Sequence, residues 1–279
     1  MEIKFLNTKD LSRAMELSRQ AGWNQTEEDW QMLWSINKKG YLGAFENGIL
    51  VGTVGTINYP NAFGFINMVL VDKNYRGKGI GKILVTHAIE LLENIKTIKL
   101  DATALGKPLY EQYGFRDEEK IVRMVCDQSI HKCPPVKANF LTSDDIENIK
   151  TMDEQVFGGD RSIVLQQLIA KNPNMSFLIK GSEQPVGFGI GRKGINYYHI
   201  GPLVAENQET AENLVLSIIQ VHPNANWMID VFTRHEKWIK WLTNLGFKEQ
   251  RTFIRMALGI NNSTARIDNQ FSIAGPELA

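Results

Sequence analysis

The chain has 279 residues, 43% of them hydrophobic and 22% charged, a globular composition long enough for two ordinary domains. The formal net charge is zero and the pI is about 7.0, so no global field favours nucleic acid or an anionic membrane. The scattered basic and aromatic residues carry no nucleic-acid signature. We therefore expect neither a nucleic-acid nor a membrane partner.

The two cysteines and the histidines predict no metal site. Cys126 and Cys133 match neither a CxxC redox pair nor a zinc knuckle, and His131 near them would be a third ligand without a fourth. Free thiols fit a reducing cytosol. The first residues form no signal peptide, and no apolar run approaches the roughly 20 residues of a membrane span. A cytoplasmic protein without a metal is the expectation.

The first half alternates predicted strands and helices, which indicates an α/β fold with a mixed sheet. Thr26 is a good N-cap for the second helix, and Glu46-Asn47-Gly48 reads as a hairpin turn. Asp72 follows an apolar strand and can cap the next turn. The expected strands cover residues 2–6, 41–45, 49–58, 65–71, 97–103 and 121–126, and the expected helices cover 9–19, 27–36, a segment ending near 93, and 108–113.

The stretch around Trp23 allows two interpretations. Its tryptophans pack a core in the simpler one. In the other, Trp23 with the acidic neighbours Glu27 and Glu28 lines a pocket for a cationic amine.

Residues 75–82 form the most informative motif, Tyr-Arg-Gly-Lys-Gly-Ile-Gly-Lys, between a strand and a helix. Such a turn exposes backbone N–H groups and directs the positive end of a helix dipole at one point. Glycine lets a ligand approach the backbone closely, and Arg76, Lys78 and Lys82 add positive charge. The motif predicts a diphosphate cradle. The alternative is a glycine-rich turn with incidental charges.

Two other nucleotide motifs do not fit this stretch. A P-loop aligned on Gly81-Lys82 would need glycine at Arg76 and Ser or Thr at Ile83. The dinucleotide fingerprint would need a third glycine at Lys82, and no acidic partner is obvious about 20 residues later.

Four sequence matches recur in the same order in the second half, with an offset of 132 to 135 residues. This pattern argues for a duplicated domain. We predict a first domain over 1–127, a linker over 128–137, a second domain over 138–260 and a tail over 261–279 that the sequence does not place. The matched segments are 5–10 with 140–145, 51–52 with 186–187, 70–71 with 203–204, and 114–124 with 246–256.

Both halves resemble domains of the GNAT superfamily of N-acyltransferases, each a central mixed sheet flanked by helices. The resemblance rests on Arg-Gly-x-Gly-x-Gly after a strand and on the stretch from Leu109 to Phe115, Leu-Tyr-Glu-Gln-Tyr-Gly-Phe. The segments 21–26, 101–103 and 106–110 further resemble a tandem type with a divergent C-terminal domain.

The resemblance implies an acetyl-CoA site in the first half. It places the pyrophosphate on the loop of Arg76, Gly77, Lys78, Gly79, Ile80, Gly81 and Lys82. The pantetheine arm would pair with the backbone of Val69, Leu70 and Val71, where the fourth and fifth strands splay apart, and an N–H of Val69 or Leu70 would hold the thioester oxygen.

Tyr110 matches the tyrosine that many members use to protonate the departing thiolate, although it can also be a core aromatic beside Phe115. The general base is less defined. Asp101 is a candidate base, with structural hydrogen bonding as the alternative. Glu27, Glu28 and Asp29 are others, acting through water.

The second half departs from this pattern. Residues 209–214, Glu-Thr-Ala-Glu-Asn-Leu, replace the glycine loop, and Leu242 replaces Tyr110. We expect a degenerate domain that covers the first domain's sheet and walls an acceptor pocket. His199 and Asp230 are either residues facing that pocket or structural residues.

The expected function is acetyl-CoA-dependent N-acetyltransfer to a primary amine of a small molecule, by direct attack, in a monomer or homodimer. Three alternatives remain: a protein amine as acceptor, a non-catalytic acyl-CoA-binding regulatory module, and a purely structural interaction protein.

Overall fold

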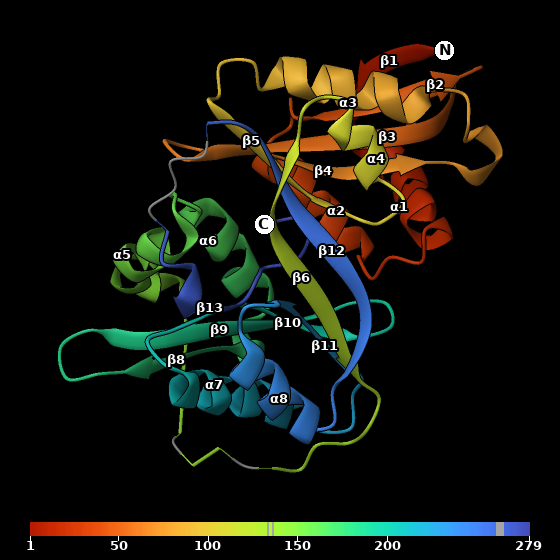
Figure 1. The fold of residues 1–279 in the computed structure, drawn as a ribbon. Coiled ribbons are helices and arrows are strands. Elements are labelled where there is room, and N and C mark those ends of the chain that lie inside the picture. Colours follow the sequence, from red (N-terminus) through yellow and green to blue (C-terminus); the bar gives the residue numbers. More distant parts are fainter. Residues whose placement is uncertain (133, 136, 261–264) are drawn as a thin grey trace.

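The computed structural model describes residues 1–132, 134–135, 137–260 and 265–279. Cys133 and parts of the predicted linker and tail lie outside these ranges. Figure 1 shows two halves of similar build, joined by two long strands. The first half contains β1 (Glu2–Phe5), α1 (Leu11–Gln20), α2 (Glu27–Ile36), β2 (Tyr41–Glu46), β3 (Ile49–Tyr59), β4 (Phe63–Val71), α3 (Ile80–Leu91), β5 (Thr97–Ala102), α4 (Lys107–Glu111) and β6 (Arg116–Cys126).

The second half repeats this order of elements, which agrees with the duplicated segments in the sequence. It contains β7 (Asn139–Phe140), α5 (Ile146–Phe157), α6 (Ser162–Lys171), β8 (Ser176–Lys180), β9 (Pro185–Lys193), β10 (Tyr198–Ala205), α7 (Gln208–Val221), β11 (Trp227–Phe232), α8 (Glu236–Asn244) and β12 (Lys248–Gly259). A further short strand, β13 (Gln270–Ser272), follows in the tail.

The described strands form one mixed sheet that runs through both halves. Along its main path the order is β1-β2-β3-β4-β5-β12-β6-β11-β10-β9-β8-β7. The last strand of each half therefore pairs with the fifth strand of the other: β12 lies antiparallel to β5, and β6 lies antiparallel to β11. The domain boundaries at 127, 138 and 260 remain predictions along the chain, and the sheet itself does not separate at them.

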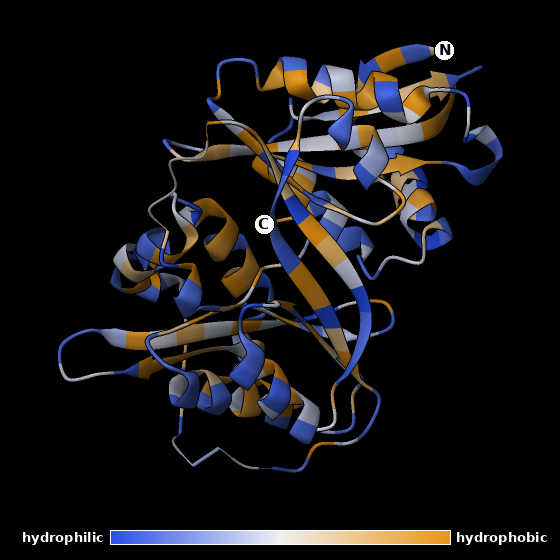
Figure 2. Cartoon of the chain, viewed as in Figure 1, coloured by the Kyte–Doolittle hydropathy of each residue, from blue (hydrophilic) through white to orange (hydrophobic). Residues whose placement is uncertain are grey.

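The hydrophobic core also crosses between the halves. One cluster of buried residues contains Trp30 and Tyr59 from the first half together with Leu165 and Phe188 from the second. Figure 2 shows hydrophobic residues along the inner strands and hydrophilic ones at the turn between β8 and β9. Because burial of apolar surface drives folding, this shared cluster holds the two halves together.

The parallel strands β4 and β5 separate after a short contact. Gly64 pairs with Ile98 and Phe65 with Lys99, and no pairing follows toward the end of β4. The equivalent strands β10 and β11 also part after Ile200, but there β13 pairs with β10. The predicted splay is thus present in both halves, and the chain itself fills the second one. No helix in the described ranges is long and apolar enough to cross a bilayer.

Candidate active site

The glycine loop opens α3 without a side-chain cap. Gly77 and Gly79 both have left-handed backbone with φ of +77°, and Gly79 is the N-cap residue. A Cβ added at either glycine meets no heavy atom within 4 Å, so the outer side of the loop is open. Among the described residues, no group accepts a hydrogen bond from the amides of Gly77, Lys78 or Gly79. Free donors of this kind at a helix N-terminus have the chemistry that anion binding requires.

The cationic side chains of the loop are exposed. Arg76 Nε donates to the carbonyl of Val71 at 3.2 Å, which holds its guanidinium next to the end of β4. Lys78 Nζ lies 4.8 Å from the centre of the Tyr75 ring. Asp72 accepts from the Asn74 amide at 2.9 Å and so caps the turn, as expected.

A bulge marks β4 beside the gap. Met68 has a φ of +49°, and the register with β3 shifts between the pairs Gly55–Asn67 and Thr53–Leu70. Thr53 Oγ1 donates to the Met68 carbonyl at 2.7 Å, which fixes the bulge. Bulges re-aim the backbone and are frequent beside active sites. The predicted residues Val69, Leu70 and Val71 follow this bulge on the edge of the gap, and no sequence signal indicated the bulge itself.

Tyr110 lies on α4 and is 8% exposed. Its ring is 6.1 Å from that of Phe115, and both belong to the cluster against which Val69 and Val71 pack. Burial raises the pKa of the Tyr110 hydroxyl above its ordinary value, so the group is protonated at neutral pH. Its position is compatible with both of the roles predicted for it.

Asp101 on β5 is bound on both carboxylate oxygens. Arg255 Nε and Nη2 on β12 donate to them at 2.8 and 2.9 Å, and the Asp101 side chain is fully buried. Burial raises the pKa of Asp101, although Arg255 favours its charged form. The contacts match the structural alternative, because the Asp101 carboxylate is fully buried in a bidentate ion pair and is not reached by solvent.

The predicted acceptor residues at the start of α2 point mostly outward. Glu27 and Glu28 are exposed, and Trp23 is half-buried against the shared core. The buried polar residues of this stretch are instead Asn24, Gln25 and Asp29. Of these, only Asp29 was among the predicted base candidates, and its carboxylate is engaged by Arg192. The capping box that Thr26 forms with Asp29 turns the Asp29 carboxylate inward.

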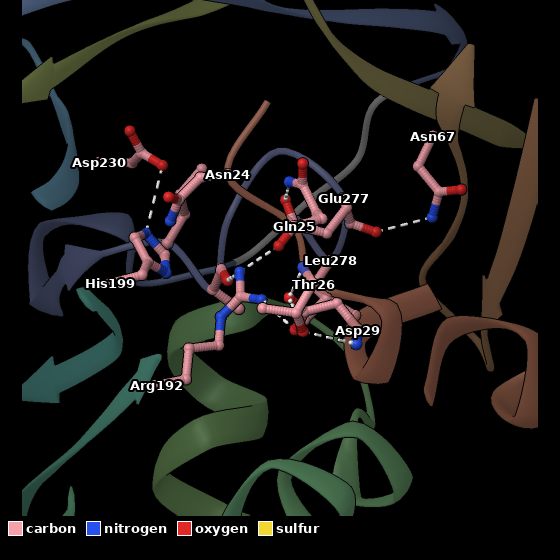
Figure 3. Close-up of polar contacts among 12 residues, drawn as sticks. Asn24, Gln25, Thr26, Asp29, Asn67, Arg192, His199, Asp230, Glu277 and Leu278 are labelled. Carbon is pink, nitrogen blue, oxygen red and sulfur yellow. Dashed lines mark hydrogen bonds and ion pairs between the residues drawn. The ribbon is translucent and has the colours of Figure 1, made fainter. Parts of the chain in front are cut away.

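His199 and Asp230 are buried together at the interface between the halves (Figure 3). His199 Nε2 lies 3.3 Å from Asp230 Oδ2, and Arg123 Nε and Nη2 each donate to Asp230 at 2.7 Å. Burial lowers the pKa of His199, so its ring is neutral at pH 7. Burial opposes ionisation of Asp230, but Arg123 and His199 hold its pKa below the usual range. The Arg123–Asp230 pair joins β6 to β11 and acts as a structural link.

The tail lies across the interface that Figure 3 draws. Glu277 accepts from Gln25 Nε2 at 2.8 Å and forms an ion pair with Arg192 Nη2. Arg192 Nη1 also donates to Asp29 Oδ1 at 2.7 Å. A cavity of only about 10 Å³ remains beside these side chains, about the volume of one water probe.

The matching positions of the second half differ. Asn207 Oδ1 accepts from the Thr210 amide at 2.9 Å and caps α7, so this helix N-terminus has a side-chain partner. Leu242, in place of Tyr110, is fully buried in α8.

A cavity of about 540 Å³ opens elsewhere in this half, between α5 and the end of β10, and Gln155, Glu206 and Arg266 line part of it. Across the described ranges, His, Cys, Asp and Glu side chains do not gather in threes as metal ligands.

Comparison with known proteins finds the same family in both halves of the chain. The family model described as "Acetyltransferase (GNAT) family" matches residues 8–115, and the one described as "Acetyltransferase (GNAT) domain" matches residues 149–272. An "Uncharacterized N-acetyltransferase YitH" of Bacillus subtilis is 26% identical over 250 residues, which are 88% of this chain and 87% of the relative. A "Holothin acyltransferase" of a Pseudoalteromonas species is 25% identical over 238 residues, 85% of this chain and 81% of that protein.

A solved structure shares the whole architecture. The putative acetyltransferase from Pyrococcus horikoshii superposes with a TM-score of 0.86 at 22% identity, covering 100% of this chain and 95% of that one. This likeness concerns the fold, and the two family matches identify the family. The chain belongs to the GNAT superfamily of acyltransferases, with one GNAT domain in each half.

Proposed function

We propose that the first half transfers an acetyl group from acetyl-CoA to a primary amine of a small molecule. This proposal rests on the open loop around Gly77 and Gly79, which lies beside the gap between β4 and β5. In the second half the corresponding gap holds β13 and the helix N-terminus is capped. We therefore place a single catalytic centre in the first half, and the second half serves it.

The residues of the loop fit a diphosphate group. Both left-handed glycines leave room where a side chain would stand, and the free amides at the start of α3 present donors. Exposed Arg76, Lys78 and Lys82 supply compensating charge. Among the described strands, none pairs with β4 after Phe65 on the β5 side, so this edge can accept an extended pantetheine arm.

Bound acetyl-CoA would supply an acyl carbonyl activated as a thioester. A backbone N–H of Val69 or Leu70, re-aimed by the bulge at Met68, would stabilise the oxygen of that carbonyl as charge develops on it. The neutral amine attacks the carbonyl carbon, the carbon–sulfur bond breaks, and Tyr110 donates its proton to the leaving sulfur. The proton released from the nitrogen passes to water and restores Tyr110.

We assign no side chain as the general base. Asp101 is held by Arg255, and Glu27 and Glu28 lie on the surface. The ammonium form of the acceptor would lose its proton to solvent before binding. Activity should then rise with pH toward the pKa of the amine itself.

The second half favours a small acceptor over a folded protein. The shared core and the tail close the face of β4 opposite α3, where we place the acceptor. The two curated relatives are named as an N-acetyltransferase and an acyltransferase, which supports acyl transfer as the reaction.

Calorimetry with acetyl-CoA, combined with a thiol-release assay over a panel of amines, tests the proposal. We expect binding of one acetyl-CoA per chain and release of coenzyme A thiol with at least one primary amine. Tight binding without thiol release on any amine would favour a non-catalytic acyl-CoA-binding module. Absence of binding would refute both functions.

A further inference from the structure

The segment after β13 lies against the strand that borders the gap. Asn67 Nδ2 donates to the Glu277 carbonyl at 2.7 Å, and the Tyr59 hydroxyl donates to the Leu278 carbonyl at 2.5 Å. Asn67 directly precedes Met68, the left-handed residue of the β4 bulge. Tail residues therefore occupy the side of β4 on which the proposed function places the acceptor.

These contacts have the chemistry of a recognition site. Two side chains of the first half bind main-chain carbonyls, and Arg192 of the second half binds the carboxylate of Glu277. All three are buried, so the hydrogen bonds and the ion pair form away from water, where they discriminate most strongly between ligands.

Among the described residues, Arg192 has one partner outside the tail, Asp29, besides the tail groups Glu277 and the Ala274 carbonyl, to which Nη2 donates at 3.1 Å. Asp29 binds its guanidinium from the first turn of α2, where the capping box with Thr26 fixes the carboxylate. The contact with Asp29 fixes one side of the guanidinium, which orients the donors that face Glu277 toward an anion.

The tail leaves part of this site unsatisfied. Arg192 Nε and Gln25 Oε1, both next to Glu277, are buried without a hydrogen-bond partner in the described part of the chain. Buried polar atoms without protein partners are uncommon, and an ordered water, an ion or a ligand can satisfy them. The small cavity beside them has the size of one water, and a ligand with more polar groups than the tail could also reach them.

We propose that Arg192 binds the carboxylate of an amine acceptor, that Asn67 and Tyr59 are donors to any carbonyl the acceptor carries, and that Glu277-Leu278 occupies this site as an internal competitor. This inference rests on the proposed function, and it names the acceptor class. Displacing the tail would free Arg192 for the carboxylate of the acceptor, and Asn67 or Tyr59 for its carbonyl.

Gly275 offers a way to displace the tail without changing the site. It has a φ of +118°, and an added Cβ would stand 2.7 Å from Glu277 Oε1 and 2.8 Å from Arg192 Nη2. Gly275→Ala should therefore dislodge Glu277, and Glu277→Gln should weaken the ion pair. Hydrogen exchange of residues 273–279 in the full chain reports whether the tail is released, and thermal unfolding reports whether the variants fold.

The first measurement compares two acceptors, 4-aminobutanoate and butylamine, which differ by the carboxylate. In Gly275→Ala we expect KM for 4-aminobutanoate to fall about fivefold or more, with KM for acetyl-CoA unchanged. Arg192→Met should abolish the preference for 4-aminobutanoate over butylamine. A released tail with KM for 4-aminobutanoate within about twofold of wild type would overturn the proposal.

The second measurement needs no turnover, so it separates this inference from the proposed function. An N-acetylated peptide, Ile-Ala-Gly-Pro-Glu-Leu-Ala, carries a fluorophore and is titrated with Gly275→Ala protein. We expect binding that acetyl-CoA does not displace, and that weakens about tenfold or more with glutamine in place of the glutamate. Equal binding of the two peptides, or none by a folded variant, would refute the site even if amines are acetylated.

Discussion

The cofactor site is best tested by comparing substitutions at two glycines that have the same left-handed backbone conformation but lie in different loops. Gly79 begins α3 with a φ of +77°, and Gly48 lies in the hairpin turn between β2 and β3 with a φ of +79°. An added Cβ meets no heavy atom within 4 Å at either position. Replacing either glycine by alanine therefore introduces the same backbone strain, and only Gly79 belongs to the proposed diphosphate loop.

The size of each effect follows from this geometry. A residue with a Cβ in left-handed conformation costs about 1–2 kcal/mol, so both alanine variants should lose about that much free energy of unfolding. Gly79→Glu adds a negative charge where the diphosphate would bind. Two like charges 4 Å apart repel each other by roughly 1 kcal/mol in water and by about 4 kcal/mol at a protein surface. For a site between these limits we expect a repulsion of about 2 kcal/mol, which weakens acetyl-CoA binding about 30-fold.

Calorimetry with acetyl-CoA and urea unfolding should be run on the four variants Gly48→Ala, Gly79→Ala, Gly79→Gln and Gly79→Glu. The difference between the glutamine and glutamate variants isolates the charge, and it should shrink in about 1 M salt as screening increases. Acetyl-CoA affinity of Gly79→Glu within about threefold of wild type would refute the loop as the diphosphate site. Weakened binding in Gly48→Ala would show that strain alone explains the loss.

Three further predictions test other parts of the molecule. Tyr110→Phe should lower kcat by about 100-fold or more without changing acetyl-CoA affinity. Tyr113→Phe, just after α4, removes a hydroxyl that donates to the Lys82 carbonyl and should lower kcat far less; equal effects on kcat would contradict the acid role. Arg255→Met leaves the Asp101 carboxylate buried without its arginine partner, so the free energy of unfolding measured in urea should fall by about 3–5 kcal/mol. The double variant Asp101→Leu plus Arg255→Met should lose less, because it also removes the buried charge. Burial lowers the pKa of His199 in the folded protein, so the neutral ring contributes its whole stabilisation above the unfolded pKa of about 6.5. As the pH falls below that value, the free energy of unfolding should decrease by at most about 1.4 kcal/mol per pH unit. His199→Gln should flatten this slope between about pH 7.5 and 5.5.

Local patterns predicted most elements of the first half to within a few residues. The strand and helix periods, the Thr26 cap and the hairpin at Gly48 all have short-range causes, so neighbouring residues suffice to predict them. The strand expected over 121–126 begins five residues earlier, at Arg116, because β12 pairs along that extension. A partner more than 100 residues away in the chain has no local signal.

The candidate site also combines features with local causes, which could be predicted, and features that depend on distant residues, which could not. The loop from Gly77 to Gly79 was predictable because glycine spacing and a following helix determine its conformation locally. The bulge at Met68, the capture of Asp101 by Arg255 and the closeness of Glu277 to Arg192 depend on strands and a tail brought together by the fold. Charges at such positions look alike in sequence whether they are free or paired.

By itself, the sequence determined the duplication, the family and the half of the chain that keeps a glycine loop, because these depend on residue types at fixed spacing. Only the tertiary structure decided that β6 and β12 each pair with the fifth strand of the opposite half, and that the tail fills both the second gap and the interface. Strand exchange and tail placement minimise exposed sheet edge and apolar surface over the whole molecule, so no local stretch of residues specifies them.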